Sequence, residues 1–131
     1  MIIADSTVWI DFIRDPDTGH GALLRDLLRE RRLALVGVVL AEVLRGLNPE
    51  NTQEVQDLLD FVPFIEMTRT TWRLSGEIAQ ALDLKGQRLP MADIFIAARA
   101  LEGDHEVFTR DKHFQRIPGL RLYQPEGDEG A

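Results

Sequence analysis

The chain is a short acidic sequence whose composition excludes several classes of protein. Its 131 residues suffice for one domain with a real core, and Cys 0 excludes disulfide frameworks and thiolate metal sites, which fits a reducing cytoplasm. The formal net charge of -7 argues against a protein that simply coats nucleic acid, and the longest apolar run, residues 33–41, is about half of the roughly 18 residues that a membrane helix requires.

Strands and helices alternate in the first half of the chain. Apolar residues 1–4 indicate a short buried strand, and residues 8–13 then look helical. Leucines at 23, 24, 27 and 28 recur at helical spacing with charged residues between them, so 19–32 is predicted as an amphipathic helix. A strand at 33–36 and a helix from 38 follow, and we expect this helix to close at Gly46 or Asn48.

The second half repeats the alternation and predicts the fold class. The expected elements are a helix at 51–62, a strand at 64–67, helices at 70–86 and 90–103, a strand at 106–109, a short helix at 111–117 and a strand at 120–123. Such a pattern predicts an α/β fold with a mainly parallel sheet. We expect residues 1–125 to form the domain and the acidic residues 126–131 to form a disordered tail.

Four acidic residues stand in apolar surroundings. Asp5 and Asp111 follow the ends of predicted strands, where open parallel sheets bind ligands, while Glu42 and Asp93 interrupt apolar helices. Unpaired buried carboxylates are strongly unfavourable, so each needs a partner or a hydrated cavity. Converging carboxylates are typical ligands of Mg²⁺ or Mn²⁺, which could support phosphodiester hydrolysis.

Each acid taken alone also has a purely structural interpretation. Asp5 could cap a helix, Asp93 could complement a helix dipole, and Glu42 could pair with Arg45 one turn away. These alternatives stay open for the single residues. The occurrence of all four in this order favours a shared metal site.

The motifs resemble those of PIN-domain ribonucleases, specifically the VapC-type toxins of VapBC toxin–antitoxin systems. The similar segments are IIADSTVWIDFI, LAEVLRGL, DIFIAARAL and VFTRDKHFQRIPGLRL, which together span Ile2 to about Leu122. The resemblance implies a three-layer α/β/α sandwich, an acidic pocket that binds Mg²⁺ or Mn²⁺, endonucleolytic cleavage of RNA, a VapB-type antitoxin as partner and a homodimer. It assigns catalysis and metal binding to Asp5, Glu42, Asp93 and Asp111, and supporting hydroxyls to Ser6 and Thr109.

The sequence also offers candidate substrate contacts and alternative functions. Cations near the acids are candidate contacts for RNA phosphates, namely Arg110, Lys112, Arg116, Lys85 and Arg88. The histidines show no metal-ligand spacing, and the two tryptophans are expected in the core or at a subunit interface. A metal-dependent DNA nuclease and a non-catalytic PIN scaffold remain alternatives. A phosphatase of the haloacid dehalogenase type is disfavoured because Thr7 stands where its second Asp is required.

Overall fold

The centre of the fold is a five-stranded parallel sheet. A computed structural model describes residues 1–125, and its strands lie in the order β3-β2-β1-β4-β5. Their bounds are β1 Ile2–Ala4, β2 Leu33–Val36, β3 Phe64–Ile65, β4 Glu106–Phe108 and β5 Arg121–Leu122. All four neighbouring pairs are parallel, and Ile3 of β1 is in register with Ala34 and Val107. The predicted parallel α/β fold is thus confirmed.

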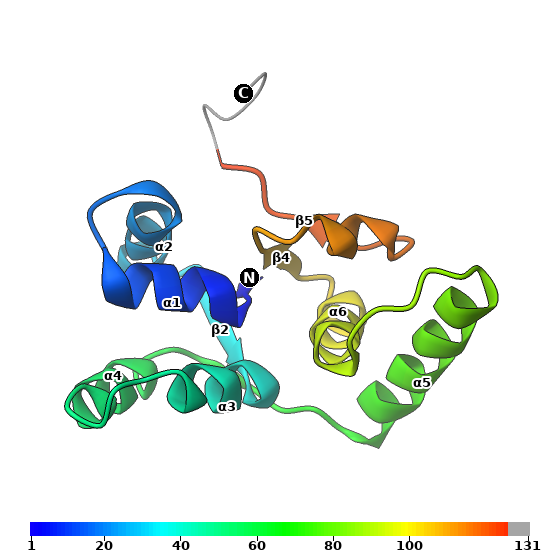
Figure 1. Cartoon of the computed structure of the whole chain (residues 1–131), viewed down its shortest axis with the longest axis horizontal. Helices are drawn as coiled ribbons and strands as arrows, with labels where there is room; N and C mark the ends of the chain where they lie inside the picture. The colour runs from blue at the N-terminus through cyan, green and yellow to red at the C-terminus, as the bar shows by residue number, and fades with distance from the viewer. Residues whose placement is uncertain (126–131) are drawn as a thin grey trace.

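Within residues 1–125, six α-helices and one 3-10 helix flank the sheet. Their bounds are α1 Ser6–Arg14, α2 Gly19–Arg29, α3 Gly37–Arg45, α4 Thr52–Leu59, α5 Arg69–Leu84, α6 Met91–Gly103 and the 3-10 helix η1 Lys112–Arg116. The α1–α2 pair lies on one side of the strands and the α5–α6 pair on the other (Figure 1). The result is the expected three-layer α/β/α sandwich. No helix in the described residues is long and apolar enough to cross a membrane.

The core explains why the strands read as unbroken apolar runs. Every residue of β1 and β2 is buried, as expected for parallel strands covered on both faces. Helix α6 is buried on several sides. Its buried residues are Ile94, Ile96, Ala97, Ala98 and Ala100. Trp9 is fully buried, as predicted for a core aromatic, whereas the Trp72 side chain is 48% exposed.

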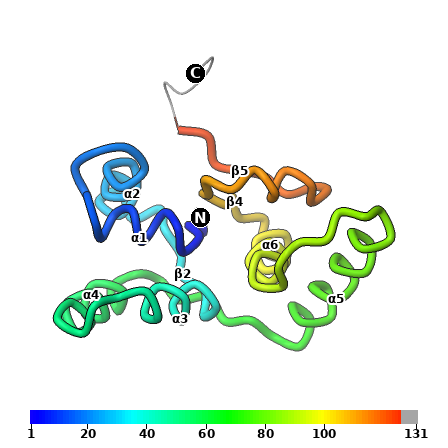
Figure 2. Tube along the Cα trace, in the orientation of Figure 1, coloured from blue at the N-terminus to red at the C-terminus, as the bar shows by residue number. Residues whose placement is uncertain are grey.

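The strand order creates a switch point between β1 and β4. From β1 the chain proceeds through α1 and α2 to β2, whereas from β4 it proceeds through η1 to β5 on the opposite side. Neighbouring strands whose connections diverge leave a crevice beyond their carboxyl ends. The N-terminus, from which β1 begins, lies near the centre of the molecule (Figure 2).

β2 has the predicted bounds, whereas the other four strands are shorter than predicted, and hydrogen bonding explains one of these differences. The strand expected at 64–67 contains only Phe64–Ile65, because the carbonyl of Glu66 accepts a 2.9 Å hydrogen bond from Nε of Arg99 on α6. β4 ends at Phe108, so Thr109 leaves the sheet. The expected disordered tail, 126–131, lies outside the described residues.

Candidate active site

Asp5 is a buried carboxylate that joins the ends of two strands. It follows β1 directly, is 4% exposed, and donates its backbone N–H to the carbonyl of Phe108 in β4 at 3.0 Å. Its Oδ1 accepts from the backbone N–H of Val8 at 3.2 Å and from the Thr7 hydroxyl at 2.6 Å. Its Oδ2 accepts a short hydrogen bond from the Thr109 hydroxyl.

The Asp5 carboxylate therefore caps a helix and can accept one further hydrogen bond or bind an ion. The bond to Val8 confirms that it is the N-cap of α1. An ionised carboxylate can accept about four hydrogen bonds, and three are made here. The capping role uses Oδ1, so Oδ2, which faces the loop after β4, is the oxygen with more capacity for a water or an ion.

Thr109 connects the first acid to the fourth. While donating to Asp5, its hydroxyl accepts the backbone N–H of Asp111 at 2.9 Å. The Asp111 carboxylate caps η1 by accepting the backbone N–H of His113 at 2.9 Å, and Nδ1 of the same histidine lies 3.2 Å away. Thr109 thus makes the contact expected of a supporting hydroxyl, and its effect on activity stays a prediction.

Thr7 is a residue that sequence reasoning missed. The sequence gives Thr7 no role in the site, yet its hydroxyl donates a hydrogen bond to Oδ1 of Asp5. Ser6, the predicted supporting hydroxyl, is the half-buried first residue of α1, and its role stays a prediction. The missed signal was the spacing, since a Thr two residues after an N-cap Asp can reach back to its carboxylate.

The pKa of Asp93 is affected by the charges of the other three acids. It is half-buried in the first turn of α6, and burial raises its pKa to about 6, with further contributions from the negative charges of Asp111, Asp5 and Glu42. The neighbouring His113 offsets part of this rise. Coulomb energies fall with distance, so these three carboxylates are near enough to Asp93 for their charges to affect its ionisation. The four acids, far apart in sequence, therefore lie toward one region of the fold.

The chemistry of the four candidate ligands, Asp5, Glu42, Asp93 and Asp111, fits a hard divalent ion. All four candidate ligands offer carboxylate oxygen, which Mg²⁺ and Mn²⁺ prefer. Within residues 1–125, however, no three acidic or histidine side chains lie close enough together to enclose an ion as they stand. Mg²⁺ keeps several waters and often uses only one or two protein carboxylates, so such an open arrangement is compatible with it.

The candidate phosphate contacts differ in their surroundings. Nε of Arg110 lies 3.0 Å from Oδ2 of Asp11, so this cation is already paired with α1. Lys112 and Arg116 are exposed on η1 beside the fourth acid, and Lys85 and Arg88 are exposed before α6. Their contacts with RNA stay predictions.

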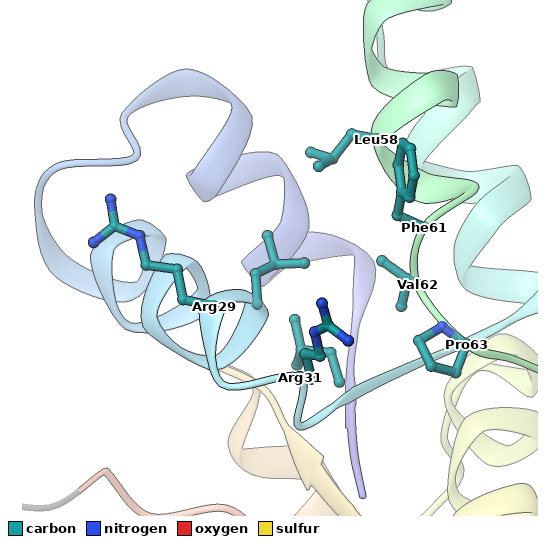
Figure 3. A pocket seen from close by; sticks show the side chains of 8 residues that line it. Arg29, Arg31, Leu58, Phe61, Val62 and Pro63 are labelled. Carbon is teal, nitrogen blue, oxygen red and sulfur yellow. The ribbon is translucent and has the colours of Figure 1, made fainter.

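A large apolar pocket of about 520 Å³ lies elsewhere, between α2 and the end of α4. It is lined by Leu28, Arg29, Arg31, Leu33, Leu58, Phe61, Val62 and Pro63. Leu58 and Phe61 lie on one side of it and Arg29 on the other (Figure 3). Because none of these lining residues is an acid, the pocket cannot supply the carboxylate chemistry of the candidate active site.

Comparisons with known proteins agree with this fold. A family model described as "PIN domain" matches residues 2–120. VapBC2 of Rickettsia felis bound to a promoter DNA fragment is 25% identical, with a TM-score of 0.78 and coverage of 94% of this chain and 98% of that chain. DNA-bound VapBC of Salmonella typhimurium is 24% identical (TM-score 0.80; 93% and 96% covered), and FitAcB of Neisseria gonorrhoeae is 22% identical (0.74; 95% and 98%). A search of curated proteins found no match.

Proposed function

The chain belongs to the PIN-domain family, and on that basis we propose that it is a divalent-metal-dependent endoribonuclease that acts as the toxin of a toxin–antitoxin pair. One observation carries the proposal. Burial raises the pKa of Asp93, and the charges of Asp111, Asp5 and Glu42, the three other candidate ligands, raise it further. The mutual repulsion of these like charges is unfavourable for folding, and a bound cation would offset it.

In this proposal the chain's residues prepare the site for Mg²⁺ or Mn²⁺. Asp5, Glu42, Asp93 and Asp111 would hold the ion, which would supply a Lewis acid to activate water and stabilise charge on the phosphate. Thr7 and Thr109 fix the Asp5 carboxylate in one orientation through their hydroxyls. Asp93 must be ionised to act as a ligand, so cleavage should decline as the pH falls below about 6.

Cleavage is expected to require a divalent ion and to prefer RNA. The purified chain should cut structured or unstructured RNA with Mg²⁺ or Mn²⁺ and lose this activity in excess EDTA, because the four candidate ligands are carboxylates and the chain has no cysteine nucleophile. Mapping the cut ends gives the position of hydrolysis. Undiminished cleavage in EDTA would disprove metal dependence, equal cutting of DNA would support the DNA nuclease, and binding without cleavage would support the scaffold.

We also propose a VapB-type antitoxin as the partner that restrains this nuclease. The structures it resembles include VapBC complexes, and acidic pockets are readily blocked by an arginine that forms charge-assisted bonds with the carboxylates. A partner segment laid over Asp5 and Asp93 would inhibit in this way. The same proposal places the protein in the cytoplasm, where its RNA substrates are found.

Homodimerisation is proposed for the exposed apolar surface around Trp72. This ring packs edge-on against Phe95 with centroids 5.0 Å apart, and Phe64 is 46% exposed beside the same hollow. Trp72→Glu should convert a dimer into a monomer in light scattering at micromolar concentration, because it places a charge in an apolar interface. The matched control is Phe61→Glu in the apolar pocket of Figure 3, which should leave the mass unchanged. A wild-type monomer would contradict the proposal.

A further inference from the structure

A small polar pocket includes the fourth acid, Asp111, in its lining. Its volume is about 90 Å³, and residues from the start of α2, from the loop after β4, from η1 and from the segment after β5 surround it. The lining includes His20, Thr109, Arg110, Lys112, Gln115 and Tyr123. The pocket therefore combines cations, an amide and hydroxyls from three separate stretches of the sequence, namely the start of α2, residues 108–115 and residues 122–125.

The charges around this pocket are arranged for an anion. Lys112 is exposed, and the described residues give it no acidic side chain within ion-pair distance. The Arg110 guanidinium is anchored by Asp11, which limits its movement while leaving its other nitrogens available as donors. Asp111 also lines the pocket, but its Oδ1 is occupied by His113. Lys112 is thus the cation with the greatest freedom to bind a ligand.

The size and position of the pocket are compatible with a phosphate group. Its volume of about 90 Å³ corresponds to roughly three waters at about 30 Å³ each. The pocket shares Thr109 and Asp111 with the acidic site. A strand with its scissile phosphate at the acids would therefore present a neighbouring phosphate here.

We infer that this pocket, which we call the phosphate pocket, binds the backbone phosphate next to the scissile bond of the RNA, with Lys112 as its principal cation and Gln115 and His20 as further donors. The inference rests on the proposed ribonuclease function and adds a substrate contact to it. Phosphate contacts carry no sequence information, so the pocket should set affinity and register without selecting bases.

The test uses a small ligand that cannot be cleaved. A ribonucleoside 3′,5′-bisphosphate titrated into the isotope-labelled full chain should shift the backbone amide signals of His20, Lys112 and Gln115. Lys112→Gln should weaken this binding on the order of ten-fold and should reduce the salt slope of RNA binding by about 0.7, the value for one phosphate on a single strand. The matched control is Arg29→Gln, which removes the same charge at the other end of α2 and should change neither quantity.

The outcomes separate this inference from the proposed function. If RNA is cleaved but Lys112→Gln behaves like Arg29→Gln, the phosphate pocket is wrong and the nuclease stands. If the bisphosphate binds at Lys112 but no RNA is cleaved, the pocket stands as a phosphate site and the proposed activity fails. Amide shifts confined to residues outside the pocket would also overturn it.

Discussion

Asp93→Asn is expected to reduce RNA cleavage steeply, by on the order of a hundred-fold or more, since a metal ligand is lost from the site. The substitution keeps the shape of the side chain and removes one negative charge near those of Asp5, Glu42 and Asp111. Initial cleavage rates at saturating Mg²⁺ measure the effect. The control is Glu50→Gln, an exposed carboxylate in the turn before α4, which should retain wild-type rates. A fully active Asp93→Asn would remove Asp93 from the site.

The same variant should be at least as stable as the wild type when metal is absent. The folded-state pKa of Asp93, about 6, lies above the ordinary value of 3.8, so its contribution to stability is fully present below pH 3.8 and is lost as the pH rises through about 6. At neutral pH the wild type therefore bears a penalty that Asn avoids. After discounting for solvent screening of a half-exposed group, we expect a gain on the order of 1 kcal/mol or less. Urea unfolding in EDTA at pH 7 and at pH 4 should show the advantage only at pH 7.

Asp5→Ala should have the opposite effect on stability and should lower the free energy of unfolding by about 2–4 kcal/mol. Loss of an N-cap costs about 0.5–2 kcal/mol, and each buried donor left without its acceptor costs about 1–3 kcal/mol. Here the cap of α1 disappears, and the Thr7 and Thr109 hydroxyls lose their partner in a residue that is only 4% exposed. Urea unfolding in EDTA measures this cost independently of metal binding.

A second variant in the same pocket provides the control for Asp5→Ala. Asp111→Ala removes the cap of the five-residue η1, but its carboxylate is only half-buried and its partner His113 is exposed. We therefore expect a loss of about 1 kcal/mol or less. Equal losses for the two variants would mean that the hydrogen bonds from Thr7 and Thr109 contribute little to the fold.

Local pattern was sufficient to predict the layers and the candidate ligands. Apolar runs of four residues gave β1 and β2, and the capping signal at Gly46 gave the end of α3. Asp5 and Asp111 could be placed at one rim because parallel strands end at the same edge of a sheet. These predictions depend on the chain direction and on short-range periodicity, both of which a sequence displays directly.

The contacts between distant side chains could not be predicted in the same way. The pair between Asp11 and Arg110 depends on how α1 packs beside the loop after β4, and the sequence specifies neither the distance nor the rotamers. The phosphate pocket has the same origin, because His20 shows no ligand spacing in the sequence and shares a pocket with Lys112 only through the fold. By pattern alone, Trp72 could lie in the core or at an interface. Its exposure on α5 in the structure excludes the core.

The most direct measurement of whether the four acids form one metal site is the change in melting temperature that Mg²⁺ produces in the wild type and in Asp93→Asn. A ligand stabilises a protein only by preferring its folded state, so millimolar Mg²⁺ should raise the wild-type melting temperature above its value in EDTA. The rise should be much smaller in Asp93→Asn, which has lost one ionic ligand from the pocket. If Asp93→Asn gains as much from Mg²⁺ as the wild type, or melts well below it in EDTA, then Asp93 serves to stabilise α6 and the four acids do not form a common metal site.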